Sequence, residues 1–153
     1  MRKILHYIGR LLTTNNFNIK SAFKVMYDRN WDKIYLFCDI HGTILEPDYG
    51  KVAKKYYPNA KKTLQYLTKN NKVKLILYTC SYEHEINEYV ELFESDGIIF
   101  DYINENPEAE NTRGGCFDKK SYFNILLEDK AGFIGDYDWL IVYYLIKFHS
   151  KFY

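Results

Sequence analysis

The run Ile34-Tyr35-Leu36-Phe37-Cys38 restricts the fold of this 153-residue chain more than any other segment. It is short and continuously apolar, and it ends on an acid, Asp39. A strand with one solvated face would alternate apolar and polar residues, whereas a strand buried on both faces of a parallel sheet has this unbroken pattern. We therefore predict a buried strand over residues 33–39.

Strand and helix patterns alternate along the rest of the chain. Further strands are expected over 73–78, 98–103 and 122–127, and helices over 59–70, 83–93 and 139–148. Residues 43–58 have no long period and contain two prolines and a glycine, which predicts a loop. This order favours an α/β fold with a Rossmann-like, doubly wound, mostly parallel sheet.

The first thirty residues predict two helices, separated by a polar stretch over 13–18. Asn18 or Ser21 is expected to cap the second helix. In the first, five apolar side chains share one helical face: Ile4, Leu5, Ile8, Leu11 and Leu12. We expect residues 1–32 to be a helical extension packed on a single α/β domain over 33–153, and hold binding to a membrane surface as the less favoured alternative.

Cysteine usage and the N-terminus both favour a cytoplasmic protein. Cys38, Cys80 and Cys116 form no CxxC pair, and an odd number of cysteines without a secretory signal is typical of a reducing compartment. The apolar stretch near the N-terminus is interrupted by His6 and Arg10 and is too short to cross a bilayer. No membrane span is expected.

Charge is distributed unevenly along the chain, although the net charge is only +1. Residues 1–75 hold 15 Lys and Arg against 5 Asp and Glu, and residues 76–153 hold 6 against 15. A basic side of the folded molecule would attract anions. The alternative is that two solvated faces simply neutralise each other.

Polar residues with phosphoryl-transfer chemistry follow the expected strands. Asp39 follows the first, Thr79-Cys80-Ser81 the second and Glu128-Asp129 the fourth, which Lys119-Lys120 precede. Ligands of open α/β sheets bind beyond the carboxyl ends of the strands. A carboxylate can attack phosphorus, oxygen ligands hold Mg²⁺, and hydroxyl or ammonium donors stabilise the transferring group.

These segments resemble the four motifs of the haloacid dehalogenase superfamily, in the family's order. Asp39-Ile40-His41-Gly42-Thr43 is similar to the first motif, Asp-x-Asp-Gly-Thr, and Leu75 to Thr79 is similar to the second. Lys120 matches the third motif, and the run Asn124 to Ala131 matches the fourth as found in small capless members. The resemblance covers about residues 33–145.

The resemblance implies a Mg²⁺-dependent phosphatase that acts through an aspartyl-phosphate. Asp39 would be the nucleophile and a metal ligand, and His41 would contribute its backbone carbonyl to the metal. Thr79 would hydrogen-bond the phosphoryl oxygens and Lys120 would neutralise them, with Lys119 as a rival. Glu128, Asp129 or both would complete the magnesium site.

A second segment also resembles the fourth motif. Gly135-Asp136-Tyr137-Asp138 contains the Gly-Asp pair found in some members, but residues 131–134 before it make a poorer strand than 122–127. We favour Glu128 and Asp129 as metal ligands. Asp136 or Asp138 is then expected to cap the last helix.

His41 stands where phosphatases of this family usually have a second aspartate, which protonates the leaving oxygen and later activates water. Loss of a general acid–base typically costs about 10²–10⁴ in rate. Three interpretations follow: histidine replaces the aspartate, the enzyme is slow or specialised for an activated leaving group, or the site binds a phosphorylated ligand without turnover.

The gaps between the motifs leave no room for a cap domain, so the site is expected to be open. An open site favours a large phosphorylated substrate, and the lysines at 51, 54, 55, 61 and 62 could guide an anionic polymer. A nucleic-acid end phosphatase is therefore one alternative. A catalytically inactive binding or regulatory module is the other.

Overall fold

The computed structural model describes residues 4–5, 8–9, 18–48 and 50–153. Its strands are β1 (Ile34–Cys38), β2 (Val73–Leu77), β3 (Tyr102–Ile103) and β4 (Ile125–Leu127). Its helices are α2 (Ile19–Asp28), α3 (Ala60–Thr68), α4 (Glu83–Ser95) and α5 (Gly135–Phe152), and η2 (Asp129–Ala131) is a short 3₁₀ helix.

The four strands form one parallel sheet in the order β3-β2-β1-β4. β1 is central, and its last residue, Cys38, pairs with Leu77 of β2 on one side and with Leu127 of β4 on the other. All the carboxyl ends therefore meet at one edge. The expected Rossmann-like α/β fold is confirmed.

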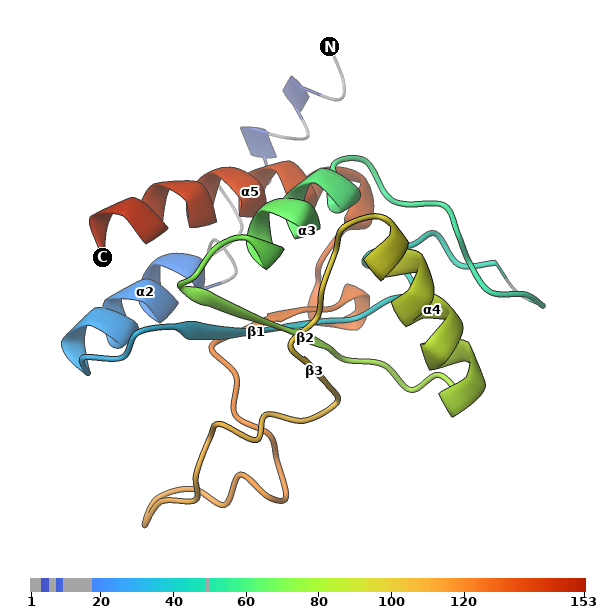
Figure 1. Ribbon diagram of the computed structural model, residues 1–153. Coiled ribbons are helices and arrows are strands. Elements are labelled where there is room, and N and C mark those ends of the chain that lie inside the picture. The colour runs from blue at the N-terminus through green and yellow to red at the C-terminus, as the bar shows by residue number, and fades with distance from the viewer. Residues whose placement is uncertain (1–3, 6–7, 10–17, 49) are drawn as a thin grey trace.

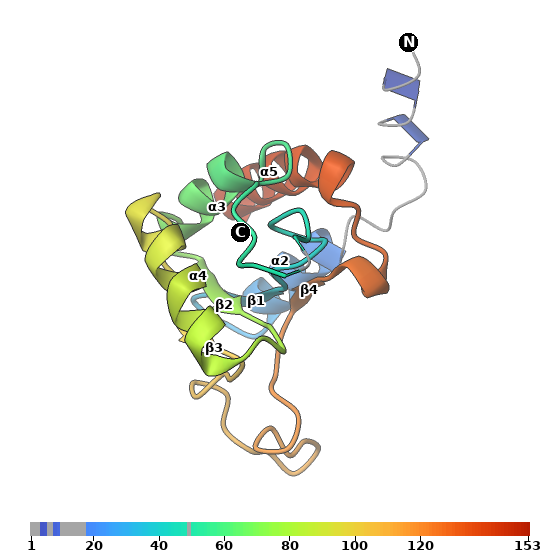
Figure 2. The same ribbon diagram turned by 90° about the vertical axis from the view of Figure 1, so that its right-hand side faces the viewer.

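The two faces of the sheet are covered differently (Figures 1 and 2). Helices α2, α3 and α5 lie over one face, α4 flanks the β3 side, and the irregular segment 104–124 lies on the opposite face. This segment makes the crossover from β3 to β4, and Phe123 at its end packs on Phe37 of β1 with ring centroids 5.4 Å apart. Aromatic side chains thus cover a face where doubly wound folds usually carry a helix.

The main core lies between the sheet and the helices. Alternate residues of the two central strands enter it, as their buried apolar side chains require. These are Ile34, Leu36 and Cys38 of β1 and Val73, Leu75 and Leu77 of β2. From α2, Ile19, Phe23 and Met26 are also fully buried, so this helix is part of the core.

Both outer strands are shorter than expected, for a shared reason. The Asp101 N–H donates to the Leu75 carbonyl, and the Asp101 carboxylate accepts from the Leu75 N–H at 2.9 Å. Asn124 makes the same paired contact with Tyr35 on the other side of the sheet. In each case a side chain takes the place of a backbone carbonyl, so the regular ladder begins only at the following residue.

The N-terminal prediction falls partly outside the described residues. Of the first expected helix, residues 4–5 and 8–9 are helical, and Ile4, Leu5 and Ile8 are exposed. Asn18 does precede α2, but it does so in the left-handed region (φ 59°) without a side-chain hydrogen bond to the helix.

The last helix begins at Gly135, four residues before the expected start. The carboxylate of Asp138, fully buried, accepts a hydrogen bond from the Ile134 N–H at 2.7 Å and fixes the first turn. Gly135 is required because a Cβ there would lie 2.5 Å from ring atoms of Tyr57. These contacts hold α5 against the end of the loop that follows β1.

Trp139 joins α5 to the loop directly after Asp39. Its side chain is fully buried, its indole N–H donates to the Thr43 carbonyl at 2.8 Å, and its ring packs edge-on against Phe133 at 5.1 Å. A buried carbonyl needs such a donor because water cannot reach it.

No separate domain is inserted among residues 18–48 and 50–153: the segments between strands are helices or loops of the α/β unit itself. Among the described helices, none combines the length and apolarity needed to cross a membrane.

We predict that Trp139→Phe lowers the free energy of unfolding by about 1–3 kcal/mol, because the Thr43 carbonyl stays buried without a donor. Urea denaturation followed by circular dichroism measures the change. Tyr144→Phe, on an exposed part of the same helix, is the matched control and should stay within about 0.5 kcal/mol of wild type. Equal stability of Trp139→Phe and wild type would contradict the role of this hydrogen bond.

Candidate functional site

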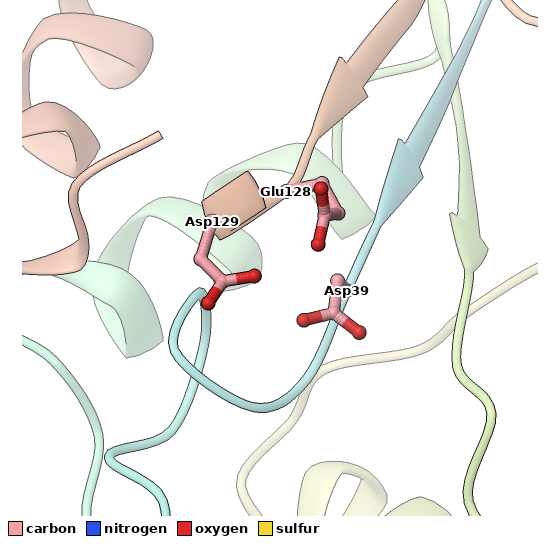
Figure 3. Close-up of side chains that lie close together, drawn as sticks. All are labelled: Asp39, Glu128 and Asp129. Carbon is pink, nitrogen blue, oxygen red and sulfur yellow. The ribbon is translucent and has the colours of Figure 1, made fainter. Parts of the chain in front are cut away.

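The pairing of β1 with β4 places three carboxylates at one edge of the sheet. Cys38 lies opposite Leu127, and the Asp39 N–H continues the ladder by donating to the Leu127 carbonyl at 3.0 Å. Asp39 thus stands beside the residues that follow β4, Glu128 and Asp129. Figure 3 shows the three side chains around a common space.

The cluster of Asp39, Glu128 and Asp129 has the chemistry of a site for a hard cation. Each residue offers an oxygen, all three oxygens lie within 4.8 Å of one another, and each side chain is half-buried. Mg²⁺ is typically held by a few carboxylates and completes its octahedron with water and substrate oxygens. The donor set therefore fits Mg²⁺.

Local hydrogen bonds orient the two acids after β4. The Glu128 carboxylate caps η2 by accepting from the Ala131 N–H at 2.8 Å. The Asp129 carboxylate accepts from the Lys130 N–H, also at 2.8 Å. Each acid keeps one carboxylate oxygen outside these backbone contacts, so a cation could still be bound.

Gly42 allows the loop after β1 to approach Asp129 closely. Its φ is +80°, a conformation that side chains disfavour, and a Cβ at this position would lie 2.8 Å from the Asp129 Oδ2. Any other residue would strain the loop and push Asp129 out of the cluster.

Burial raises the pKa of Asp39 to about 6, and repulsion from the carboxylates of Glu128 and Asp129 adds to this effect. A backbone hydrogen bond from Ile40 and the nearby charge of Lys130 act in the opposite direction. The ionised carboxylate is therefore at a disadvantage in the metal-free fold, and a bound cation would compensate for it.

The His41 side chain contacts α4. Its Nε2 lies 2.7 Å from the hydroxyl of Tyr89, which also accepts a hydrogen bond from the Ala53 N–H at 3.1 Å. No hydrogen bond from the described residues reaches the His41 carbonyl, so this oxygen stays available for the ligand role that the family resemblance implies.

Thr79 lies at the same edge of the sheet, two residues after the end of β2. Its hydroxyl donates to the Ser81 Oγ at 3.1 Å and accepts from the Ser81 N–H at 3.2 Å, while its own N–H donates to Asn104. The threonine thus shapes the turn into α4, and its hydroxyl would have to exchange these partners to contact a ligand.

Lys120 is not brought to the cluster in this structure. It lies exposed in the segment 104–124, and no described residue forms an ion pair with it or with Lys119. The cation beside the acids is Lys130, with its ammonium 3.1 Å from Asp129 and 3.9 Å from Glu128. No motif gave Lys130 a role, although it directly follows the acid pair in the sequence.

The two acids considered as alternative metal ligands, Asp136 and Asp138, lie in the first turn of α5. Asp138 is buried at the start of α5, where it binds the Ile134 N–H, and Asp136 is exposed in the same first turn. Within the described residues, the carboxylates grouped closely enough for a cation are those of Asp39, Glu128 and Asp129.

A cleft of about 700 Å³ opens beside the cluster. Asp129 and Lys130 line it, together with His41, residues 47–48 and 50–52 of the loop after β1, and residues of α4 that include Tyr89. Three further acidic residues are part of the lining: Asp48, Glu85 and Glu88.

Comparison with known proteins supports the fold. The chain is similar to the solved structure of a conserved protein from Bacteroides thetaiotaomicron, with 28% sequence identity and a TM-score of 0.59. The match covers 75% of this chain and 90% of that chain. No family model and no curated protein matches this chain.

We predict that Asp39→Asn stabilises the metal-free protein at pH 7. A carboxyl whose pKa is raised in the folded state stabilises the fold below its unfolded pKa, and this contribution is lost as the pH rises through about 6. The asparagine amide does not ionise, so the variant does not lose this stability as the pH rises. We therefore expect its free energy of unfolding at pH 7 to exceed that of wild type by about 1–2 kcal/mol, allowing for solvent screening of a half-buried group. The gain should vanish near pH 4.

Urea denaturation with EDTA at the two pH values measures this difference. Asp28→Asn, an exposed acid of α2, is the control and should show no such pH-dependent gain. A loss of stability in Asp39→Asn that is equal at both pH values would contradict the assigned environment.

Proposed function

We propose that this protein is a Mg²⁺-dependent phosphatase that acts through an aspartyl-phosphate on Asp39, as the haloacid dehalogenase-like motifs imply. The observation that carries the proposal is the grouping of Asp39, Glu128 and Asp129 within 4.8 Å at the ends of adjacent parallel strands. An acidic cluster with this oxygen-only donor set suits a hard cation and a phosphoryl group together.

Each step of the proposed reaction is assigned to residues of this chain. An Asp39 oxygen forms a bond to phosphorus while the bond from phosphorus to the leaving oxygen breaks. Water then hydrolyses the acyl phosphate, which releases inorganic phosphate and restores the carboxylate. Glu128, Asp129 and the His41 carbonyl would hold Mg²⁺, which when bound offsets the charge repulsion between carboxylate and phosphate.

Lys130 supplies the positive charge nearest the acids. Its side chain is 83% exposed and forms ion pairs with Asp129 and Glu128, so the ammonium can move to a phosphoryl oxygen in the cleft. We therefore assign to Lys130 the neutralising role that the sequence resemblance gives to Lys120.

The cleft is lined by more acidic than basic residues, which favours a small phosphate ester as the substrate over the phosphorylated end of a nucleic acid. Asp48, Glu85, Glu88 and Asp129 outnumber the lysines at 51 and 130 in its lining. A polyanionic chain would be repelled by these walls, since phosphate backbones are bound through Lys and Arg. The basic residues at 54, 55, 61 and 62 lie outside this lining.

Incubation of the full-length protein with an aryl phosphate should release phosphate in the presence of Mg²⁺ and not with EDTA. Asp39→Asn should lower release by at least about 10³-fold, because the amide is a poor nucleophile and the proposal assigns Glu128 and Asp129 to the metal. Asp28→Asn should retain wild-type activity. Release that persists in Asp39→Asn, or that ignores the metal, would show that the proposal is wrong.

The two lysines can be compared in the same assay. We expect Lys130→Ala to lower kcat/KM by about 10–100-fold through lost charge stabilisation, and Lys120→Ala to leave it within about threefold. The reverse order of effects would return the role to Lys120 and would require the segment 104–124 to move over the cleft.

A non-catalytic phosphate-binding module is the second candidate, favoured by His41 in place of a carboxylic acid. It predicts that a phosphate analogue such as vanadate binds in the presence of Mg²⁺ without any turnover of the aryl ester. Measurable Asp39-dependent turnover would exclude it.

A further inference from the structure

One side of α5 carries large aromatic side chains that are exposed. Tyr144, Phe148 and Phe152 are spaced by four residues and therefore share one side of the helix. They are 60%, 55% and 69% exposed, and the ring centroids of Phe148 and Phe152 lie 4.5 Å apart. The outer side of a helix in a globular protein usually carries charged or polar residues. We call these three residues the aromatic stripe.

Lysines border the aromatic stripe. Lys147 and Lys151 each directly precede one of its two phenylalanines in the sequence. From α2, Lys20 lies beside His149 of α5: burial lowers the pKa of this histidine, and the charge of Lys20 adds to the effect. The ring of His149 packs edge-on against that of Phe148, with centroids 5.1 Å apart. Positive charge therefore reaches the stripe from both helices.

The two segments that contain these helices hold no acidic residue to offset this charge. Residues 1–27 contain five Lys and Arg, residues 139–153 contain two, and neither segment contains an Asp or a Glu. Asp28, the first acid of the chain, forms an ion pair with Lys24. Because α2 packs against α5, this part of the surface combines positive charge with exposed aromatic rings.

Exposed aliphatic side chains also lie on this side of the molecule. In both views, the helical residues 4–5 and 8–9 lie farther from the sheet than α5 does (Figures 1 and 2). Their exposed apolar side chains are those of Ile4, Leu5 and Ile8. In the sequence these residues are interspersed with Arg2, Lys3 and Arg10. Aliphatic and basic residues in one helical segment are typical of helices that lie in a membrane interface.

We propose that this face of the molecule binds the surface of a bilayer that contains anionic lipids. The aromatic stripe would enter the boundary between headgroups and acyl chains, and the lysines would contact the anionic headgroups. Neither the stripe nor these lysines line the cleft beside Asp129, so the inference does not rest on the proposed phosphatase function. The sequence offers membrane binding as the less favoured alternative for the first helix, and the stripe on α5 now favours it.

Two other partners are less complementary to this face. In a symmetric dimer, the same patch of both copies would meet, so lysines would face lysines. A single-stranded nucleic acid stacks its bases on flat rings, and exposed aliphatic side chains offer no such platform. The surface of an anionic bilayer suits the rings, the aliphatic side chains and the lysines together.

Flotation of the full-length protein with phospholipid vesicles measures this binding. We expect binding to phosphatidylcholine vesicles with about 30% phosphatidylserine to be at least about tenfold tighter than binding to pure phosphatidylcholine. Raising the salt concentration from about 0.1 M to about 0.5 M should weaken binding, because it screens the lysines. Absence of binding to the anionic vesicles, or equal binding to both compositions, would overturn the proposal.

A double variant, Phe148→Ser with Phe152→Ser, tests the aromatic stripe. It should weaken binding to the anionic vesicles by at least about tenfold, because two apolar side chains no longer leave water. Ile99→Ser, which removes an exposed apolar side chain from the loop before β3, is the matched control and should bind as wild type does. Equal binding by the double variant and wild type would contradict the role of the stripe.

The lysines are tested separately, in a variant that keeps the apolar surface. Lys20→Gln with Lys151→Gln should weaken binding to the anionic vesicles by about tenfold. Lys119→Gln with Lys120→Gln removes the same charge from the exposed segment 104–124, on the opposite face of the sheet, and should have little effect. Equal effects of the two pairs would show attraction to net charge alone and would overturn the assigned face.

The same proteins distinguish the other partners. Binding to a single-stranded oligonucleotide without binding to vesicles would assign the face to nucleic acid and overturn the proposal. A dimer that Phe148→Ser with Phe152→Ser dissociates, again without vesicle binding, would assign it to a second copy. Phosphate release from a soluble ester should be unchanged in these variants, so the membrane proposal and the phosphatase proposal can fail independently.

Discussion

The site depends on one constraint, the register between β1 and β4. The hydrogen bond from the Asp39 N–H to the Leu127 carbonyl continues the parallel ladder one residue beyond the last pair of strand residues. It brings an acid at the end of a central strand beside two acids at the end of its neighbour. A shift of one residue would turn Asp39 to the other face of the sheet, because side chains alternate along a strand.

The loop that follows Asp39 is fixed from three directions. Trp139 binds its Thr43 carbonyl from α5, Tyr89 binds its Ala53 N–H from α4, and Gly42 lets it touch Asp129 without a side chain between them. Packing of the helices on the sheet is therefore also what orients the backbone around the acids. This coupling explains why residues distant in sequence determine the geometry of a small site.

The sequence predicted those parts of the molecule that depend on local patterns. β1, its terminal Asp39 and the acids after β4 follow from apolar runs and strand ends, and the structure brings them together. No local pattern singles out Tyr89: the helical spacing of Ile86, Val90 and Phe93 predicts another buried face for α4, whereas Tyr89 and Phe93 are its buried residues. The late starts of β3 and β4 depend on Asp101 and Asn124 pairing with distant backbone, which no local pattern reveals.

The central claim is that Asp39 carries the phosphoryl group, and chemical trapping tests it most directly. Borohydride reduces an aspartyl-phosphate to homoserine, which peptide mass spectrometry can locate after turnover is quenched. We predict homoserine at position 39, and not at the nearby Asp48, only when both Mg²⁺ and a phosphate ester are present. Release of phosphate with an unmodified Asp39 throughout turnover would contradict the account.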